Sequence, residues 1–157
     1  MQPADLEYKV EWLMATENIK NVIAVYAKAG DDFNDPVVMS SLMTEDATWE
    51  AKGFGRHEGR ESIATELARV GQERIVWSLH FPVAPIIKLA DDLQSAHVFW
   101  WLWELLTMRD ENGVDENKWI GATYDCDFIK QADGWKIKDL VLDIKKMVPF
   151  EDVPLDL

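Results

Sequence analysis

The sequence predicts an α+β fold, in which three early helices pack on one face of a curved, largely antiparallel mixed sheet. Apolar residues recur at helical spacing before residue 71, whereas the second half of the chain alternates apolar and polar residues as strands do. Short turns rich in Gly, Asn and Asp join the predicted strands, which favours antiparallel pairing. At 157 residues, these two layers account for one domain spanning residues 1–157.

Each predicted helix carries a start or stop signal. The first is expected to end at Gly30, and the third at Gly71, because glycine commonly follows the last helical turn. The second starts with Asp35 as N-cap and Pro36 in the first turn. The predicted helices span residues 5–29, 36–43 and 60–70.

The predicted strands lie mostly after residue 72. A short strand, residues 47–51, precedes the third helix, and two prolines, Pro82 and Pro85, divide the first long run into two strands. The later strands are residues 74–81, 82–89, 94–108, 118–130 and 135–146. Residues 145–157 form a tail without periodicity, expected either to close the pocket mouth as a lid or to fray.

Composition limits the partners. A net charge of −13 disfavours nucleic acid and anionic membranes, because few cations are left to neutralise phosphates. The single cysteine, Cys126, excludes an internal disulfide. No signal peptide is visible, and the longest apolar run is too short to span a bilayer. These features predict a cytoplasmic protein.

Several segments in a fixed order resemble the SnoaL-like branch of the nuclear transport factor 2-like superfamily. They are residues 23–32, 42–49, 59–63, 80–81, 121–124 and 133–137. Within that branch the chain is most similar to the scytalone dehydratases and hexachlorocyclohexane dehydrochlorinases. The resemblance implies a cone-shaped α+β barrel around a pocket, and elimination chemistry that uses a His–Asp dyad without a cofactor.

The resemblance implies that His80 is the histidine of this dyad and Asp32 the aspartate, with Asp31 as a competitor for that place. An imidazole titrates near neutral pH and can remove a proton, while a hydrogen-bonded aspartate fixes its tautomer. The chain's two other histidines show no pairing typical of a metal site, so we expect no metal and no cofactor.

Glu104 interrupts an aromatic strand, where a buried carboxyl would have a raised pKa and could serve as general acid or base. It stands where the dehydratases carry a second histidine, and their serine and asparagine fall on Ala122 and Tyr124. The substrate is therefore expected to differ from theirs. Tyr124 could donate its hydroxyl to a carbonyl or leaving group. The other expected substrate-binding residues are Asp31, Trp49, Phe54, Trp100, Leu102 and Trp119.

The expected function is that of a lyase of the dehydratase or elimination type, or an isomerase, acting on a hydrophobic aromatic or polycyclic small molecule. A non-catalytic binding or scaffold protein is one alternative. An epoxide-hydrolase-like enzyme is another, but the predicted strands after Arg74 lack the arginine it would need. Trp101 and Trp103 alternate onto the sheet's opposite face, which predicts a homodimer or homotrimer.

Overall fold

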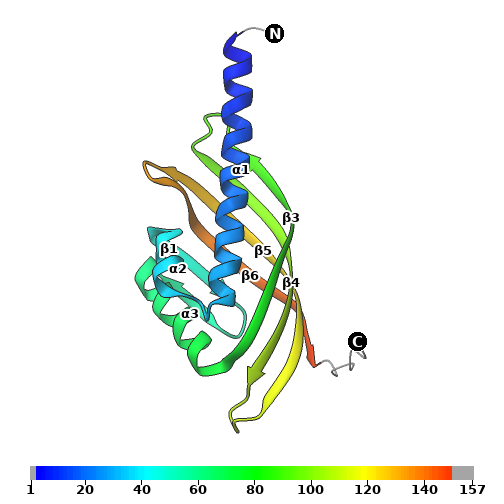
Figure 1. Cartoon of the computed structure of the whole chain (residues 1–157). Coiled ribbons are helices and arrows are strands. Elements are labelled where there is room, and N and C mark those ends of the chain that lie inside the picture. The colour runs from blue at the N-terminus through cyan, green and yellow to red at the C-terminus, as the bar shows by residue number, and fades with distance from the viewer. Residues whose placement is uncertain (1–2, 150–157) are drawn as a thin grey trace.

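The protein, seen here as a computed structural model, is described over residues 3–149, with side chains from residue 5. Three helices and six strands follow one another (Figure 1). The helices are α1 (Pro3–Asp31), α2 (Pro36–Ser41) and α3 (Arg60–Arg74). The strands are β1 (Met43–Ala51), β2 (Gly55–Glu58), β3 (Ile75–Leu89), β4 (Ser95–Arg109), β5 (Asp115–Gln131) and β6 (Gly134–Pro149).

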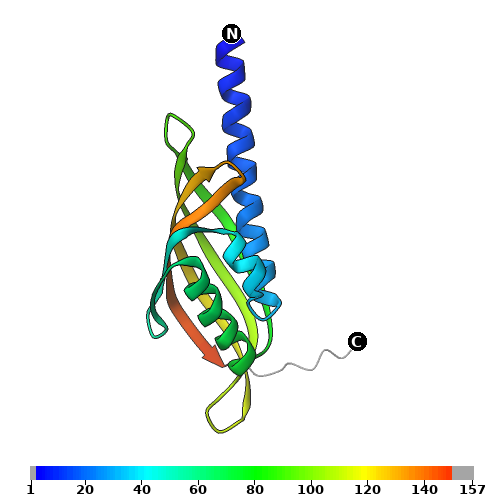
Figure 2. The same ribbon diagram turned by 90° about the vertical axis from the view of Figure 1, so that its left-hand side faces the viewer.

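The strands form one six-stranded sheet in the order β2-β1-β6-β5-β4-β3. All neighbouring pairs are antiparallel except β1 and β6, which run parallel, so the sheet is mixed. It curls around the helices, which lie on its concave side, and the N-terminal half of α1 extends beyond the sheet (Figures 1 and 2). The α+β prediction is confirmed.

The core lies between the concave face of the sheet and the helices. Even-numbered residues of β4 and β5 point inward, in keeping with strand alternation, and the inner face of α1 packs on them through Ile19 and Ile23. The largest fully buried side chains include Trp100, Phe128 and Ile137. Within residues 3–149, all three helices lie on the concave side and no helix covers the convex face.

Two glycines were assigned the wrong role. Gly30 and Gly71 lie inside α1 and α3, which continue to Asp31 and Arg74. A Cβ at Gly71 would lie 2.2 Å from the backbone oxygen of Phe33, so close helix packing requires the missing side chain there. Glycine thus marks tight contacts in these helices. Both helices continue beyond the ends predicted for them at residues 29 and 70.

The two strands predicted around Pro82 form one strand, β3. Its pairing with β4 shifts register between Val83 and Ile86, and Ala84 has a positive φ of 46°, so the strand absorbs the prolines by an irregularity. The predicted tail is also shorter than expected, because β6 continues through Pro149. Residues 150–157, which include Phe150, lie outside the described residues, so the lid stays a prediction.

Candidate active site

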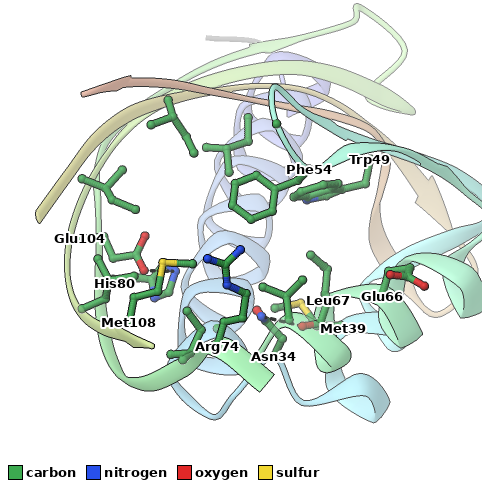
Figure 3. A pocket seen from close by; sticks show the side chains of 18 of the residues that line it. Asn34, Met39, Trp49, Phe54, Glu66, Leu67, Arg74, His80, Glu104 and Met108 are labelled. Atoms are coloured by element: carbon green, nitrogen blue, oxygen red, sulfur yellow. Dashed lines mark hydrogen bonds and ion pairs between the residues drawn. The ribbon is translucent and has the colours of Figure 1, made fainter. Parts of the chain in front are cut away.

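A cavity of about 330 Å³ opens between the concave sheet face and the helices (Figure 3). Such a volume suits a small organic molecule. Its wall is largely apolar and aromatic, with His80 and Glu104 on one side. Other lining residues include Tyr26, Asn34, Met39, Trp49, Phe54, Leu67, Arg74, Met108, Tyr124 and Met147.

His80 is held by Asp31 and not by Asp32. The Asp31 Oδ1 lies 2.7 Å from the His80 Nδ1 and also accepts the backbone N–H of His80 at 2.9 Å. Asp32 instead pairs with Lys28 one helical turn away, and 57% of its side chain is exposed. Successive helix positions point about 100° apart, so only one of the two aspartates can face β3. The assignment of Asp32 to the dyad is therefore wrong.

The end of α1 sets this geometry. A Cβ at Gly30 would lie 2.9 Å from the His80 Cε1, so the imidazole rests directly against the glycine backbone. The hydroxyl of Ser78, two residues before His80 on β3, donates to the Gly30 carbonyl at 3.4 Å. The last turn of α1 thus supplies both the surface beneath the ring and its hydrogen-bond partner.

Glu104 faces the other ring nitrogen. It lies directly opposite His80 in the β3–β4 register, and its Oε1 is 3.5 Å from the His80 Nε2. Burial raises the pKa of Glu104 and the charge of Asp31 adds to the rise, whereas a protonated His80 would lower it. Because a carboxylate only accepts hydrogen bonds, Asp31 places the His80 proton on Nδ1, leaving the Nε2 lone pair toward Glu104 and the cavity.

An aromatic hydrogen-bond chain forms a second wall. The Trp49 Nε1 donates to the Tyr26 hydroxyl at 3.1 Å, and the Tyr124 hydroxyl also donates to it. Burial raises the pKa of both tyrosines, so both hydroxyls stay protonated at neutral pH. With two donors directed at its oxygen, Tyr26 has its own proton available for a further acceptor.

Not every expected substrate-binding residue reaches the cavity. Trp49 and Phe54 line it, but Trp100 and Leu102 do not. Trp100 stacks on Tyr124 at 4.7 Å within the core, deeper along β4 than Glu104. Trp119 lies on the convex face, stacked on Trp103 at 4.9 Å, because its odd position on β5 alternates away from the buried face. These three assignments are wrong.

The sequence reasoning missed Tyr26, Asn34 and Arg74. Tyr26 lies on the apolar stripe of α1, as core residues do. Asn34 lies in the turn between α1 and α2, and its side chain donates to the Leu67 backbone oxygen at 2.9 Å. Arg74, predicted as the first residue of a strand, instead ends α3 and lines the cavity. All three enter the site through tertiary packing, and no local signal in the sequence sets them apart.

The model of the SnoaL-like domain family matches residues 11–141. The chain belongs to this family. No curated protein sequence matches the chain.

Solved structures agree with this SnoaL-like fold. The hexachlorocyclohexane dehydrochlorinase LinA-type3 from Novosphingobium barchaimii is 17% identical, with a TM-score of 0.79 over 92% of this chain and 96% of its own. A candidate scytalone dehydratase from Novosphingobium aromaticivorans is 18% identical, with a TM-score of 0.78 over 95% and 98%. A nuclear transport factor 2-like superfamily protein from Salmonella enterica is 16% identical, with a TM-score of 0.72 over 91% and 96%. At these identities the likeness shows the fold.

Two further findings concern residues 3–149 of this SnoaL-like domain. No helix in that range combines the length and the apolar character needed to cross a membrane. Within the same range, no group of three or more His, Cys, Asp or Glu side chains has a geometry that could hold a metal ion.

Proposed function

We propose that this SnoaL-like domain is a lyase of the dehydratase type that needs no cofactor and acts on a hydrophobic cyclic or polycyclic small molecule. The observation that carries the proposal is the arrangement around His80. Asp31 fixes the proton on one ring nitrogen, and a buried carboxyl stands beside the other, at the edge of an aromatic cavity. This arrangement supports the proposal because elimination of water uses a base and an acid close to each other.

In the proposed reaction the His80 Nε2 removes a proton from the carbon next to a substrate carbonyl. Asp31 stabilises the imidazolium that forms. The Tyr26 hydroxyl donates to the carbonyl oxygen as negative charge develops on it. Tyr124 orients Tyr26, because the Tyr124 hydroxyl donates a hydrogen bond to the Tyr26 hydroxyl oxygen.

Glu104 completes the elimination. Burial favours its neutral form, which gives its proton to the departing hydroxyl, and water leaves as the conjugated double bond forms. The imidazolium then returns the abstracted proton to the Glu104 carboxylate across the 3.5 Å gap. Both residues are thereby restored and the substrate has lost one water. An isomerase would expel no water, and would return the proton taken by His80 to a second carbon of the same substrate.

The alternatives have weaker support. An epoxide hydrolase of this fold would need an arginine between two aspartates. Among residues 5–149, neither cavity arginine has an ion pair with an aspartate, since Arg74 has none and Arg69 pairs with Glu66 and Glu73. A non-catalytic binder would not need a carboxyl opposite each ring nitrogen of one histidine. Burial raises the pKa of Glu104, and carboxyls with a perturbed pKa are concentrated at functional sites.

The test is turnover of a panel of cyclic β-hydroxy ketones, followed by the ultraviolet absorbance of the conjugated product. Wild-type protein should form product, and His80→Gln should lower kcat by about 10²- to 10⁴-fold. Binding of an unreactive ketone lacking the β-hydroxyl should persist in the variant, which separates lost chemistry from lost folding. Equal product formation by wild type and His80→Gln would refute the lyase.

A further inference from the structure

Arg74 is a cavity-lining cation for which residues 5–149 provide no side-chain partner. It ends α3, and its guanidinium projects into the space between His80 and Glu104 on one side and Phe54 on the other (Figure 3). Among the described residues, no side chain forms an ion pair or hydrogen bond with it. Arg69 on the same helix also borders the cavity, but it pairs with Glu66 at 3.0 Å and Glu73 at 2.7 Å.

The lack of a partner is informative because carboxylates are plentiful in this chain. It has 29 acidic and 16 basic residues, and most lysines and arginines on its surface are paired. Two carboxyls of the described residues line the cavity: Glu66 pairs with Arg69 at 3.0 Å, and burial favours the neutral form of Glu104. Arg74 is exposed to solvent where it borders the cavity, so its charge is free to meet an anionic ligand there.

A guanidinium offers five N–H donors in a planar fork that matches a carboxylate, and no acceptor. The aromatic side chains opposite it, Phe54 and Trp49, suit the flat face of a ring. A ligand that satisfied both features would carry a carboxylate at one end of an apolar ring system. The overall charge of −13 repels anions from the outer surface, so this cation is a local exception.

We infer that the site selects cyclic carboxylic acids, with the substrate carboxylate bound by Arg74 and the ring held against the aromatic wall. This inference rests on the proposed function only for the orientation of the reacting carbon toward His80; the binding of the carboxylate stands apart from any chemistry. Arg74 is a specificity residue in this account, since it binds a group remote from the bonds that change.

The test compares 2-naphthoate with the neutral, similarly shaped 2-naphthamide by isothermal titration calorimetry at low ionic strength. Wild type should bind the acid about tenfold or more tightly than the amide, because a charged bidentate pair adds to the shared ring contacts. Arg74→Gln should abolish the preference, and Arg74→Lys should retain part of it. Arg60→Gln removes an equal charge from the same helix at a position that does not line the cavity, and should leave the preference unchanged.

Absence of naphthoate binding, equal binding of acid and amide, or a preference that survives Arg74→Gln would overturn the inference. The same proteins separate it from the lyase proposal. With a carboxylated substrate, Arg74→Gln should raise KM and leave kcat nearly unchanged. His80→Gln should keep the preference for naphthoate. Loss of catalysis and loss of carboxylate binding can therefore be told apart.

Discussion

Two adjacent aspartates show how one residue's orientation decides a site. Asp31 and Asp32 carry the same side chain, and the resemblance implied Asp32 as the partner of His80, with Asp31 as a competitor. The helix places Asp31 against β3, where its Oδ1 accepts two N–H groups, and turns Asp32 toward Lys28 and solvent. A change of one position in a helix therefore separates a site residue from a surface residue.

Glu104 should give folding stability a distinct pH dependence. Burial raises its pKa above the ordinary 4.5, so the folded protein holds this proton more tightly than the unfolded chain. As pH rises through 4.5 and past the raised value, the unfolded chain releases its proton first, and the free energy of unfolding falls. Glu104→Gln removes this loss, so the variant should gain stability relative to wild type as pH increases.

Urea denaturation of both proteins between about pH 4 and pH 8 measures this difference. A stability difference that stays constant over that range would mean that Glu104 is not destabilised as an anion.

In the lyase account, wild-type activity should also decline on the alkaline side as Glu104 loses its proton. Glu104→Gln should lower kcat by about 10²-fold or more and lack that alkaline decline.

At the scale of elements, the contact between α1 and β3 builds the site. Gly30→Ala tests it, because the added Cβ would lie 2.9 Å from the His80 ring and force it to move. Alanine improves helix propensity by up to about 1 kcal/mol, while overpacking costs about 1–3 kcal/mol, so the net loss of stability should be modest. Activity should fall much further, by about 10²-fold, because the base is displaced.

Thermal unfolding measures the loss of stability in Gly30→Ala, and the imidazole NMR resonances of His80 report the displacement of the ring. Ser78→Ala is a suitable comparison, since it removes the 3.4 Å hydrogen bond to Gly30 without adding an atom beside the ring. If Gly30→Ala kept full activity and an unshifted His80 resonance, the close contact would have no functional consequence.

The elements also show what the sequence could and could not predict. Periodicity located the three helices and the long strands. Alternation along a strand puts Glu104 on one face with Trp100 and Leu102, and in β4 that face is the buried one. It could not tell how deep each lies, and only Glu104 of these reaches the cavity. Helix ends were misjudged because glycine can mark close packing as well as termination, and Pro82 was misread because an irregular strand can accommodate proline.

At the scale of the whole molecule, the convex sheet face is the main unexplained surface. Its side chains are apolar and substantially exposed: Trp77, Leu79, Phe81, Val83, Trp101 and Trp103 are 36–49% exposed. Contiguous apolar patches of this kind usually mark contact with another chain. We propose that a second copy of this chain covers it, in a homodimer or homotrimer.

Sedimentation velocity at micromolar protein concentrations tests this assembly. Wild type should sediment as a dimer or trimer, and Trp103→Glu should shift it toward monomer, because a charge would be buried at the interface. Val37→Glu places the same charge on α2, where the side chain is 76% exposed, and should not change the assembly. A monomeric wild-type protein would rule out this interface.

The arrangement of aspartate, histidine and glutamate is the central claim, and one matched pair of variants tests it most directly. The measurement is the initial rate of dehydration of a cyclic β-hydroxy ketone by wild type, Asp31→Asn and Asp32→Asn. Asp31→Asn should lower kcat by about 10²- to 10⁴-fold, because the amide favours the wrong His80 tautomer and cannot stabilise the imidazolium. Asp32→Asn should stay within about twofold of wild type, as expected for an exposed residue. Equal rates for all three proteins, or a loss confined to Asp32→Asn, would contradict the account.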